Sequence, residues 1–283
     1  MDKKVISELD CLKLVYFEII DGYSPCSDLD CYIKHFSEKE SHLLLQKKIE
    51  LQKFYSEGGV PLEEELLKQR IESGDWSKDK EEQILQLKVD ITDAENGLHT
   101  ILPAQRGFLE GILAGKQKEL GELRYERKNV LGRCVEDLVD EDVNDYVSYL
   151  SCYKDPSLTE HIKKSYQDFQ ELEQEETNKI AIILSENYKR FSEENLKFCS
   201  VMPFFLNRFS YCKEDIQSFL GTPVNQLTHN QNYLFSMGVR NLNVLQKAEG
   251  SPPDLNLNAT PLSISKWYDI QYSIQLGKSK QKS

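Results

Sequence analysis

The feature that most constrains the fold is a run of apolar residues at alternating spacings of three and four, which begins at Ile84. Such spacing places the apolar side chains on one side of an α-helix and is typical of coiled-coil contacts. A second series with the same spacing follows Pro103, but Lys116 and Arg127 interrupt it. The first series is Ile84, Leu87, Ile91, Ala94, Leu98 and Ile101, and the second is Leu109, Leu113, Lys116, Leu120, Leu123, Arg127 and Val130.

The two series predict an antiparallel, coiled-coil-like helical hairpin with its tip near residues 102–106, because proline is disfavoured inside a helix. The alternative is a single kinked helix of about 55 residues, which needs partner chains to cover its apolar positions. We expect the apolar positions of the second series to bind a partner protein or a second copy of the chain. These candidate partner-binding residues are Leu109, Leu113, Leu120 and Leu123.

Helix boundary signals recur along the rest of the chain. Thr228 and Gln231 have the spacing of a capping box and predict a helix that starts there. The aromatic group at Phe204, Phe205 and Phe209 is expected to fill a core. The segment 9–20 is compatible with either a helix or a strand, because it is long enough for a helix but rich in Val, Ile, Tyr and Phe.

The C-terminal segment has a different pattern. Residues 251–265 are rich in Pro, Asn and Ser and predict an extended linker. Beyond it, apolar and polar residues alternate, which predicts a β-strand that pairs either with the N-terminal element or with another protein. The apolar positions of this expected strand, also candidate partner-binding residues, are Tyr268, Ile270, Tyr272, Ile274 and Leu276.

Together these patterns predict a mainly α protein. We expect an elongated helical bundle with a long antiparallel hairpin and a small extended or β segment at the C-terminus. The expected segments are an N-terminal helical or mixed region (1–60), the hairpin (61–133), a C-terminal helical bundle (134–249) and the linker with its strand (250–283).

The composition limits the classes of partner. The 283 residues include 47 acidic and 35 basic side chains, which give a net charge of −12. Such a surface repels phosphate, so we expect neither nucleic acid nor a membrane surface as a partner. Charged residues interrupt the apolar stretch near the N-terminus, which argues against a signal peptide, and no run approaches the ~18–20 apolar residues of a membrane span. We therefore expect a soluble, intracellular protein.

The residues that could carry chemistry form no complete motif. Seven cysteines, an odd number, favour reduced thiols over a disulfide framework. Cys26, Cys31 and His35, with Cys11 as a distant fourth, have metal-like spacing, but zinc sites commonly use two tight ligand pairs and the second pair is incomplete. There is no glycine-rich phosphate loop, no HExxH and no G-x-S-x-G. We expect no metal, no cofactor, no catalytic residue and no enzyme activity.

Three segments taken in order resemble uncharacterised proteins of large contractile-tailed bacteriophages. They are LEEELLKQRIESGDWSKDKEEQI, then ELRYERKNVLGRCVED after the first heptad series, and later FLGTPVNQLTHNQNYLFSMG, within residues 60–250. Some of those phage proteins are thought to be assembly chaperones of the tail or baseplate hub. The resemblance implies a role in virion assembly, in the host cytoplasm or in the virion itself, and it carries over no functional residue.

The expected function is a non-enzymatic adaptor that binds virion proteins during tail or baseplate assembly. A permanent structural subunit of the virion is the first alternative. The second is a small metal- or thiol-dependent protein that uses the N-terminal cysteines and histidine, and the third is an acidic mimic of DNA.

Overall fold

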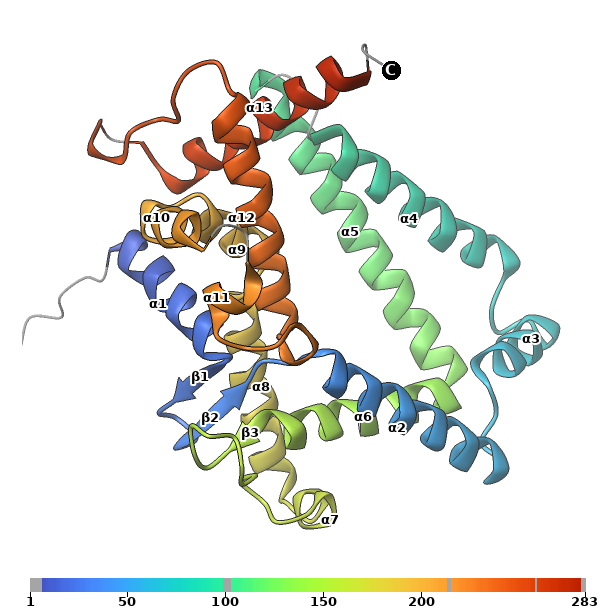
Figure 1. Ribbon diagram of the computed structural model, residues 1–283. Helices are drawn as coiled ribbons and strands as arrows, with labels where there is room; N and C mark the ends of the chain where they lie inside the picture. Colours follow the sequence, from blue (N-terminus) through green and yellow to red (C-terminus); the bar gives the residue numbers. More distant parts are fainter. Residues whose placement is uncertain (1–6, 99–102, 213–214, 258, 281–283) are drawn as a thin grey trace, which may run out of the picture. The chain divides into compact units, whose positions relative to one another are not determined.

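A computed structural model describes residues 7–98, 103–212, 215–257 and 259–280, and it confirms a mainly α protein (Figure 1). The first elements are α1 (Glu8–Asp21), β1 (Tyr23–Cys26), β2 (Cys31–Lys34), α2 (Glu38–Glu57), α3 (Glu63–Ser73), α4 (Lys78–Leu98), α5 (Pro103–Leu131), α6 (Val135–Ser151) and β3 (Cys152–Tyr153). The later elements are α7 (Tyr166–Gln170), α8 (Gln174–Arg190), α9 (Glu193–Ser200), α10 (Pro203–Tyr211), α11 (Ile216–Leu220), η1 (Val224–Gln226), α12 (His229–Lys247), η2 (Leu255–Leu257) and α13 (Pro261–Lys280).

The chain divides into two compact units. Unit 1 comprises Met1–Leu45 and Asn144–Ser283, and unit 2 comprises Gln46–Val143. The sequence suggested four successive segments instead, because contacts between its two ends cannot be recognised from local patterns. Among the described residues, no helix combines the length and the apolar character that a membrane span requires.

Unit 2 is built on α4 and α5, which lie antiparallel. Lys80 of α4 pairs with Glu126 of α5, whereas Asp90, further along α4, pairs with Lys116, so the residue numbers run in opposite directions. The apolar positions of the two series meet between the helices, where Ile84, Leu87 and Leu120 are buried with Trp76. Knobs-into-holes packing of this pair stays a prediction. Of the residues expected at the tip, 102 lies outside the described part of the chain and 103–106 form the start of α5.

The two cations that interrupt the second heptad series are both paired. Lys116 contacts the Asp90 carboxylate, and Arg127 contacts two carboxylates, Glu63 on α3 and Glu81 on α4. Glu81 also accepts a hydrogen bond of 2.7 Å from the indole Nε1 of Trp76. Polar groups at apolar seam positions restrict the register in which two helices can pair. These ion pairs therefore explain why the series tolerates charge.

The main core of unit 1 is aromatic and lies among α1, α9, α10 and α12. Phe205 and Phe209 of α10 are fully buried, as expected for the aromatic group, and their rings stack with centroids 5.3 Å apart. They also pack on Gly238 of α12, where a methyl group would lie 2.8 Å from the Cζ atom of each ring. The predicted capping box is confirmed, since Thr228 and Gln231 cap the first turn of α12.

A small antiparallel sheet of unit 1 has the order β1-β2-β3. Cys26 is the register partner of Cys31, and Ile33 is the partner of Cys152. Ile33, Cys31 and Cys152 are buried against Phe169 and residues of α8. The β structure of the protein is therefore here and not at the C-terminus, where the sequence pattern predicted it. Segment 9–20, which was compatible with a helix or a strand, lies in helix α1.

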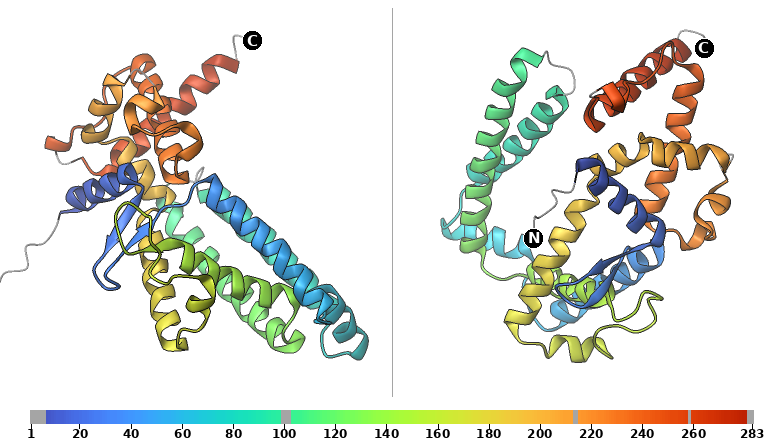
Figure 2. Two further views of the ribbon diagram at one scale, coloured as in Figure 1. Left: turned by 60° about the horizontal axis from the view of Figure 1, so that its bottom comes forward. Right: turned by 90° about the vertical axis from the view of Figure 1, so that its left-hand side faces the viewer.

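The predicted C-terminal strand is wrong, because residues 261–280 form helix α13. Thr260 and Ser263 exchange hydrogen bonds that cap its first turn, and Pro261 occupies the first helical position. Ile264 and Tyr268, four residues apart, are buried with Val201, Met202 and Val244. The strand was predicted from residues 268–276 alone. The buried face of the helix also includes Ile264, which precedes that segment. In Figure 2, α13 (red) lies against α12 (orange).

We expect Gly238→Ala to lower the free energy of unfolding by about 1–3 kcal/mol, because the added methyl group would overlap the rings of Phe205 and Phe209. The matched control is Gly277→Ala in α13, where nothing lies within 4 Å of the added methyl group. Alanine should stabilise that helix by about 0.5–1 kcal/mol. Urea denaturation followed by circular dichroism measures both changes, and stabilisation by Gly238→Ala would contradict the packing described here.

Candidate functional site

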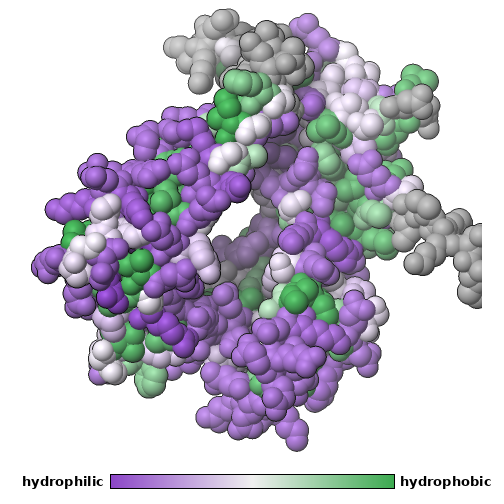
Figure 3. Space-filling view, turned by 180° about the vertical axis from the view of Figure 1, so that it is seen from behind, coloured by the Kyte–Doolittle hydropathy of each residue, from purple (hydrophilic) through white to green (hydrophobic). Residues whose placement is uncertain are grey.

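The surface is mostly hydrophilic on the face shown in Figure 3, and hydrophobic side chains gather there in separate patches. In a chain with a net charge of −12, exposed apolar side chains that share one helix face are candidates for a contact with another molecule. Both groups of candidate residues predicted from the sequence were therefore located in the structure.

The candidate leucines of α5 face the interior of unit 2. Leu120 is buried and Leu123 packs against the same core. Leu109 lies close to Gly97 of α4, and Leu113 is half-buried. Leu109, Leu120 and Leu123 are thus engaged within unit 2. Other residues of α5, Phe108 and Tyr125, are exposed instead.

The candidates of α13 are divided between the core and the surface. Tyr268 is fully buried. The remaining four are exposed: Ile270 by 58%, Tyr272 by 36%, Ile274 by 44% and Leu276 by 45%. The last three line one groove between α12 and α13. The structure therefore brings together Tyr272, Ile274 and Leu276, while it assigns Tyr268 to the fold and Ile270 to the adjoining surface.

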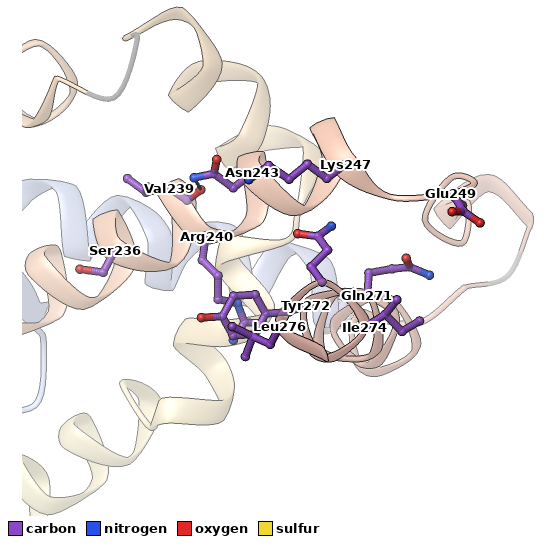
Figure 4. Close-up of a pocket in the computed structure, with 11 residues that line it drawn as sticks. Ser236, Val239, Arg240, Asn243, Lys247, Glu249, Gln271, Tyr272, Ile274 and Leu276 are labelled. Atoms are coloured by element: carbon purple, nitrogen blue, oxygen red, sulfur yellow. Dashed lines mark hydrogen bonds between the residues drawn. The ribbon is translucent and has the colours of Figure 1, made fainter. Parts of the chain in front are cut away.

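The groove has a volume of about 860 Å³, and Figure 4 shows its lining. Helix α12 contributes side chains three or four residues apart, which share one helix face. The residues of α12 are Ser236, Val239, Arg240, Asn243 and Lys247, and Glu249 lies in the loop that follows α12. Helix α13 contributes Gln271, Tyr272, Ile274, Gln275 and Leu276. The lining combines apolar carbon atoms, amides and both signs of charge.

Arg240 is the central polar group of the groove. Its guanidinium pairs with the Asp269 carboxylate and lies 4.9 Å from the ring centroid of Tyr272. Its Nε is buried and has no hydrogen-bond partner in the described part of the chain. The sequence analysis missed Arg240, because an isolated arginine on a helix carries no signal until the partner helix is placed. The one sequence signal for α13 is Thr260-Pro261, an N-cap residue followed by proline at the first helical position.

A hydrogen bond joins the two walls of the groove. The side-chain amide of Gln275 donates to the backbone carbonyl of Val244 over 3.1 Å. Together with the burial of Tyr268, this bond holds α13 against α12. The groove is therefore a formed feature of unit 1, and its groups are suited to binding by apolar contact, hydrogen bonding and charge.

A second candidate is a polar cleft of about 500 Å³ lined by residues that include Lys34, His35, Glu40 and Gln231. Burial opposes ionisation of Glu40, but hydrogen bonds from Lys34 and Ser37 outweigh it and lower the pKa of that carboxyl to about 2. Glu40 is thus committed to an internal ion pair with Lys34 at 2.7 Å. Such a pair organises the start of α2 and engages the Glu40 carboxylate.

His35 belongs to a buried chain of hydrogen bonds behind this cleft. Its Nε2 lies 2.9 Å from the Ser24 hydroxyl, which donates to Glu18 over 2.6 Å, and Arg190 pairs with the same carboxylate. In a nucleophilic triad the carboxylate orients the histidine, whereas here it holds the serine. Ser24 is also completely buried. The arrangement therefore serves the fold.

The metal-like spacing near the N-terminus does not form a cluster. His35 is held by Ser24, Cys26 and Cys31 face each other across the strand pair, and Cys11 is exposed on α1. Within the described ranges, no group of three or more His, Cys, Asp or Glu side chains is placed to hold a metal ion.

Comparisons of this chain with protein-family models, with curated proteins and with solved structures find no match. The groove between α12 and α13 is thus the candidate site on its geometry alone.

We expect stability to fall as the pH is lowered from 6.5 to 4, because burial, aided by the Arg190 charge, lowers the pKa of His35 to about 4. In that interval the unfolded chain binds a proton that the folded chain excludes, and the full effect is about 3 kcal/mol. The variant His35→Gln keeps a donor for Ser24 but cannot titrate. As the pH falls from 6.5 to 4, the natural protein should lose stability and the variant should not, so the difference in free energy of unfolding between them should shrink in urea denaturation. A deficit that stays constant with pH would refute the assignment.

Proposed function

We propose that this protein is a non-enzymatic adaptor that binds another protein in the groove between α12 and α13 during assembly of a larger particle. The observation that carries the proposal is the exposure of the apolar side chains Tyr272, Ile274 and Leu276 of α13, which line the groove together, with Ile270 exposed on the adjoining surface. The groove has a preformed volume, so a partner helix can be accommodated without remodelling of unit 1.

The apolar part of the groove supplies the binding free energy. Burial of apolar surface contributes ~25 cal/mol per Å², although the cost of association and of ordering side chains consumes much of it. Tyrosine and arginine are frequent at the energetic centre of protein interfaces, and Tyr272 and Arg240 already lie against each other. These two residues are the expected centre of the contact.

The charge of the groove selects the partner. Residues 261–283 contain four lysines and one aspartate, in contrast to the excess of acidic residues in the whole chain. The charged residues that line the groove itself are two cations, Arg240 and Lys247, and one carboxylate, Glu249. The complementary partner is an amphipathic helix with an apolar face and acidic flanks, because opposite charges speed the encounter and disfavour other partners.

The resemblance of residues 60–250 to proteins of contractile-tailed phages supports virion components as the class of partner. Both an assembly factor and a permanent subunit of the particle are consistent with a protein-binding groove. An assembly factor is absent from purified particles, whereas a subunit is present at a fixed copy number. We favour the assembly factor.

We expect Ile274→Asp to weaken partner binding by about tenfold or more, because the change removes apolar contact surface and brings a carboxylate against a partner whose flanks are acidic. The matched control is Ile182→Asp on α8, an isoleucine that is similarly exposed but lies outside the groove. Each tagged protein would be recovered from cells in which the particle assembles, and bound virion proteins would be quantified by mass spectrometry. Equal recovery with both variants, or recovery of enzymes of one metabolic pathway instead, would overturn the proposal.

A further inference from the structure

Three cysteines of unit 1 gather around the small sheet. Cys26 ends β1, Cys31 begins β2, and Cys152 lies in β3. All three are free thiols, and they pack in one apolar cluster with Phe169 and Leu184. A free thiol that only fills a core needs no second thiol beside it. Three thiols close together can in addition react with one another.

The strand register distinguishes one pair of these thiols. Cys26 and Cys31 are direct register partners in an antiparallel pair. Such partners have Cα atoms about 4.5–5.5 Å apart and side chains on the same face. Disulfides span Cα separations of about 4.4–6.8 Å, so this pair can close without movement of the strands.

Cys152 has a different relation to Cys31. Its register partner is Ile33, two residues further along β2, so Cys152 lies diagonally from Cys31. Diagonal neighbours are about 7–8 Å apart, at or beyond the limit for a disulfide. Cys152 instead donates a hydrogen bond to Cys31, which, with a weaker contribution from Cys26, lowers the pKa of the Cys31 thiol despite its burial.

The pair borders a cleft that can admit a small reagent, although Cys31 itself is only 3% exposed. A cleft of about 620 Å³ is lined by Cys26 and Cys31 together with Pro25, Tyr32 and Lys154. Cys26 is partly exposed, and burial raises the pKa of its thiol. Cys31 is thus favoured as the thiolate nucleophile, and Cys26 as the thiol that resolves the product.

We propose that Cys26 and Cys31 are a modification site that a small peroxide converts into a disulfide. The Cys31 thiolate attacks hydrogen peroxide, which breaks the O–O bond, gives a sulfenic acid and releases hydroxide. The Cys26 sulfur then attacks the sulfenic sulfur, forms the S–S bond and releases water. In total, two thiols lose two electrons and two protons, and one peroxide is reduced to two water molecules. This site is independent of the groove between α12 and α13.

Tryptic mapping of the full-length protein tests the proposal directly. Trypsin releases residues 14–34 as one peptide, which contains Cys26 and Cys31, and residues 134–154 as another, which contains Cys134 and Cys152. After treatment with about one equivalent of hydrogen peroxide and blocking of free thiols, peptide 14–34 should lose two hydrogen atoms and escape the blocking reagent. A reductant should restore both thiols.

Variants separate the proposed pair from its neighbour. Cys26→Ser should abolish the disulfide, whereas Cys152→Ala should still form it, more slowly, because Cys31 loses its hydrogen-bond donor. Cys134→Ser, in the same peptide as Cys152, should react as the natural protein does. A cross-link between the two peptides would overturn the proposal, and so would reaction that is no faster in the folded protein than in urea. Both of these measurements, the test for a cross-link and the comparison of reaction rates, use the natural sequence and do not depend on whether a variant folds.

Discussion

The burial of Tyr268 and Ile264 is the contact on which the functional account depends. Their side chains enter an apolar cluster with Val201, Met202 and Val244, and this contact fixes one side of α13 against α9 and α12. Because a helix has 3.6 residues per turn, the side chains that follow on other faces cannot share that burial. Ile270, Ile274 and Leu276 are consequently exposed, and the groove beside them is a result of how α13 is anchored.

The same logic explains which parts of the fold could be predicted from the sequence. Periodic apolar residues and caps act over a few neighbouring positions, so the helices of unit 2 and the Thr228 cap of α12 were recognisable. The strand pair was not, because four-residue strands carry almost no periodicity and depend on α8 and Phe169 for their burial. Segment 268–276 alternates in a manner that fits a strand, whereas the cap at Thr260 and the burial of Tyr268 against Val244 favour a helix.

Charge has separate roles in the two units. In unit 2, Lys116 and Arg127 interrupt the heptad series but meet Asp90, Glu63 and Glu81, so the ion pairs specify how α3, α4 and α5 align. In unit 1, Arg240 pairs with Asp269 and lines the groove between α12 and α13. Of the candidate residues predicted from the sequence, Leu120 and Leu123 of α5 and Tyr268 of α13 therefore serve the fold, while Ile270, Tyr272, Ile274 and Leu276 of α13 are exposed. Arg240 could not be predicted, since its role depends on the position of another helix.

The most direct test of the central claim is hydrogen–deuterium exchange of the protein with and without a bound virion partner. The account predicts slower exchange in the presence of the partner at residues 236–247 and 268–277, the two walls of the groove. Protection confined to α5, or to the polar cleft around His35, would contradict the claim that the groove between α12 and α13 is the binding site.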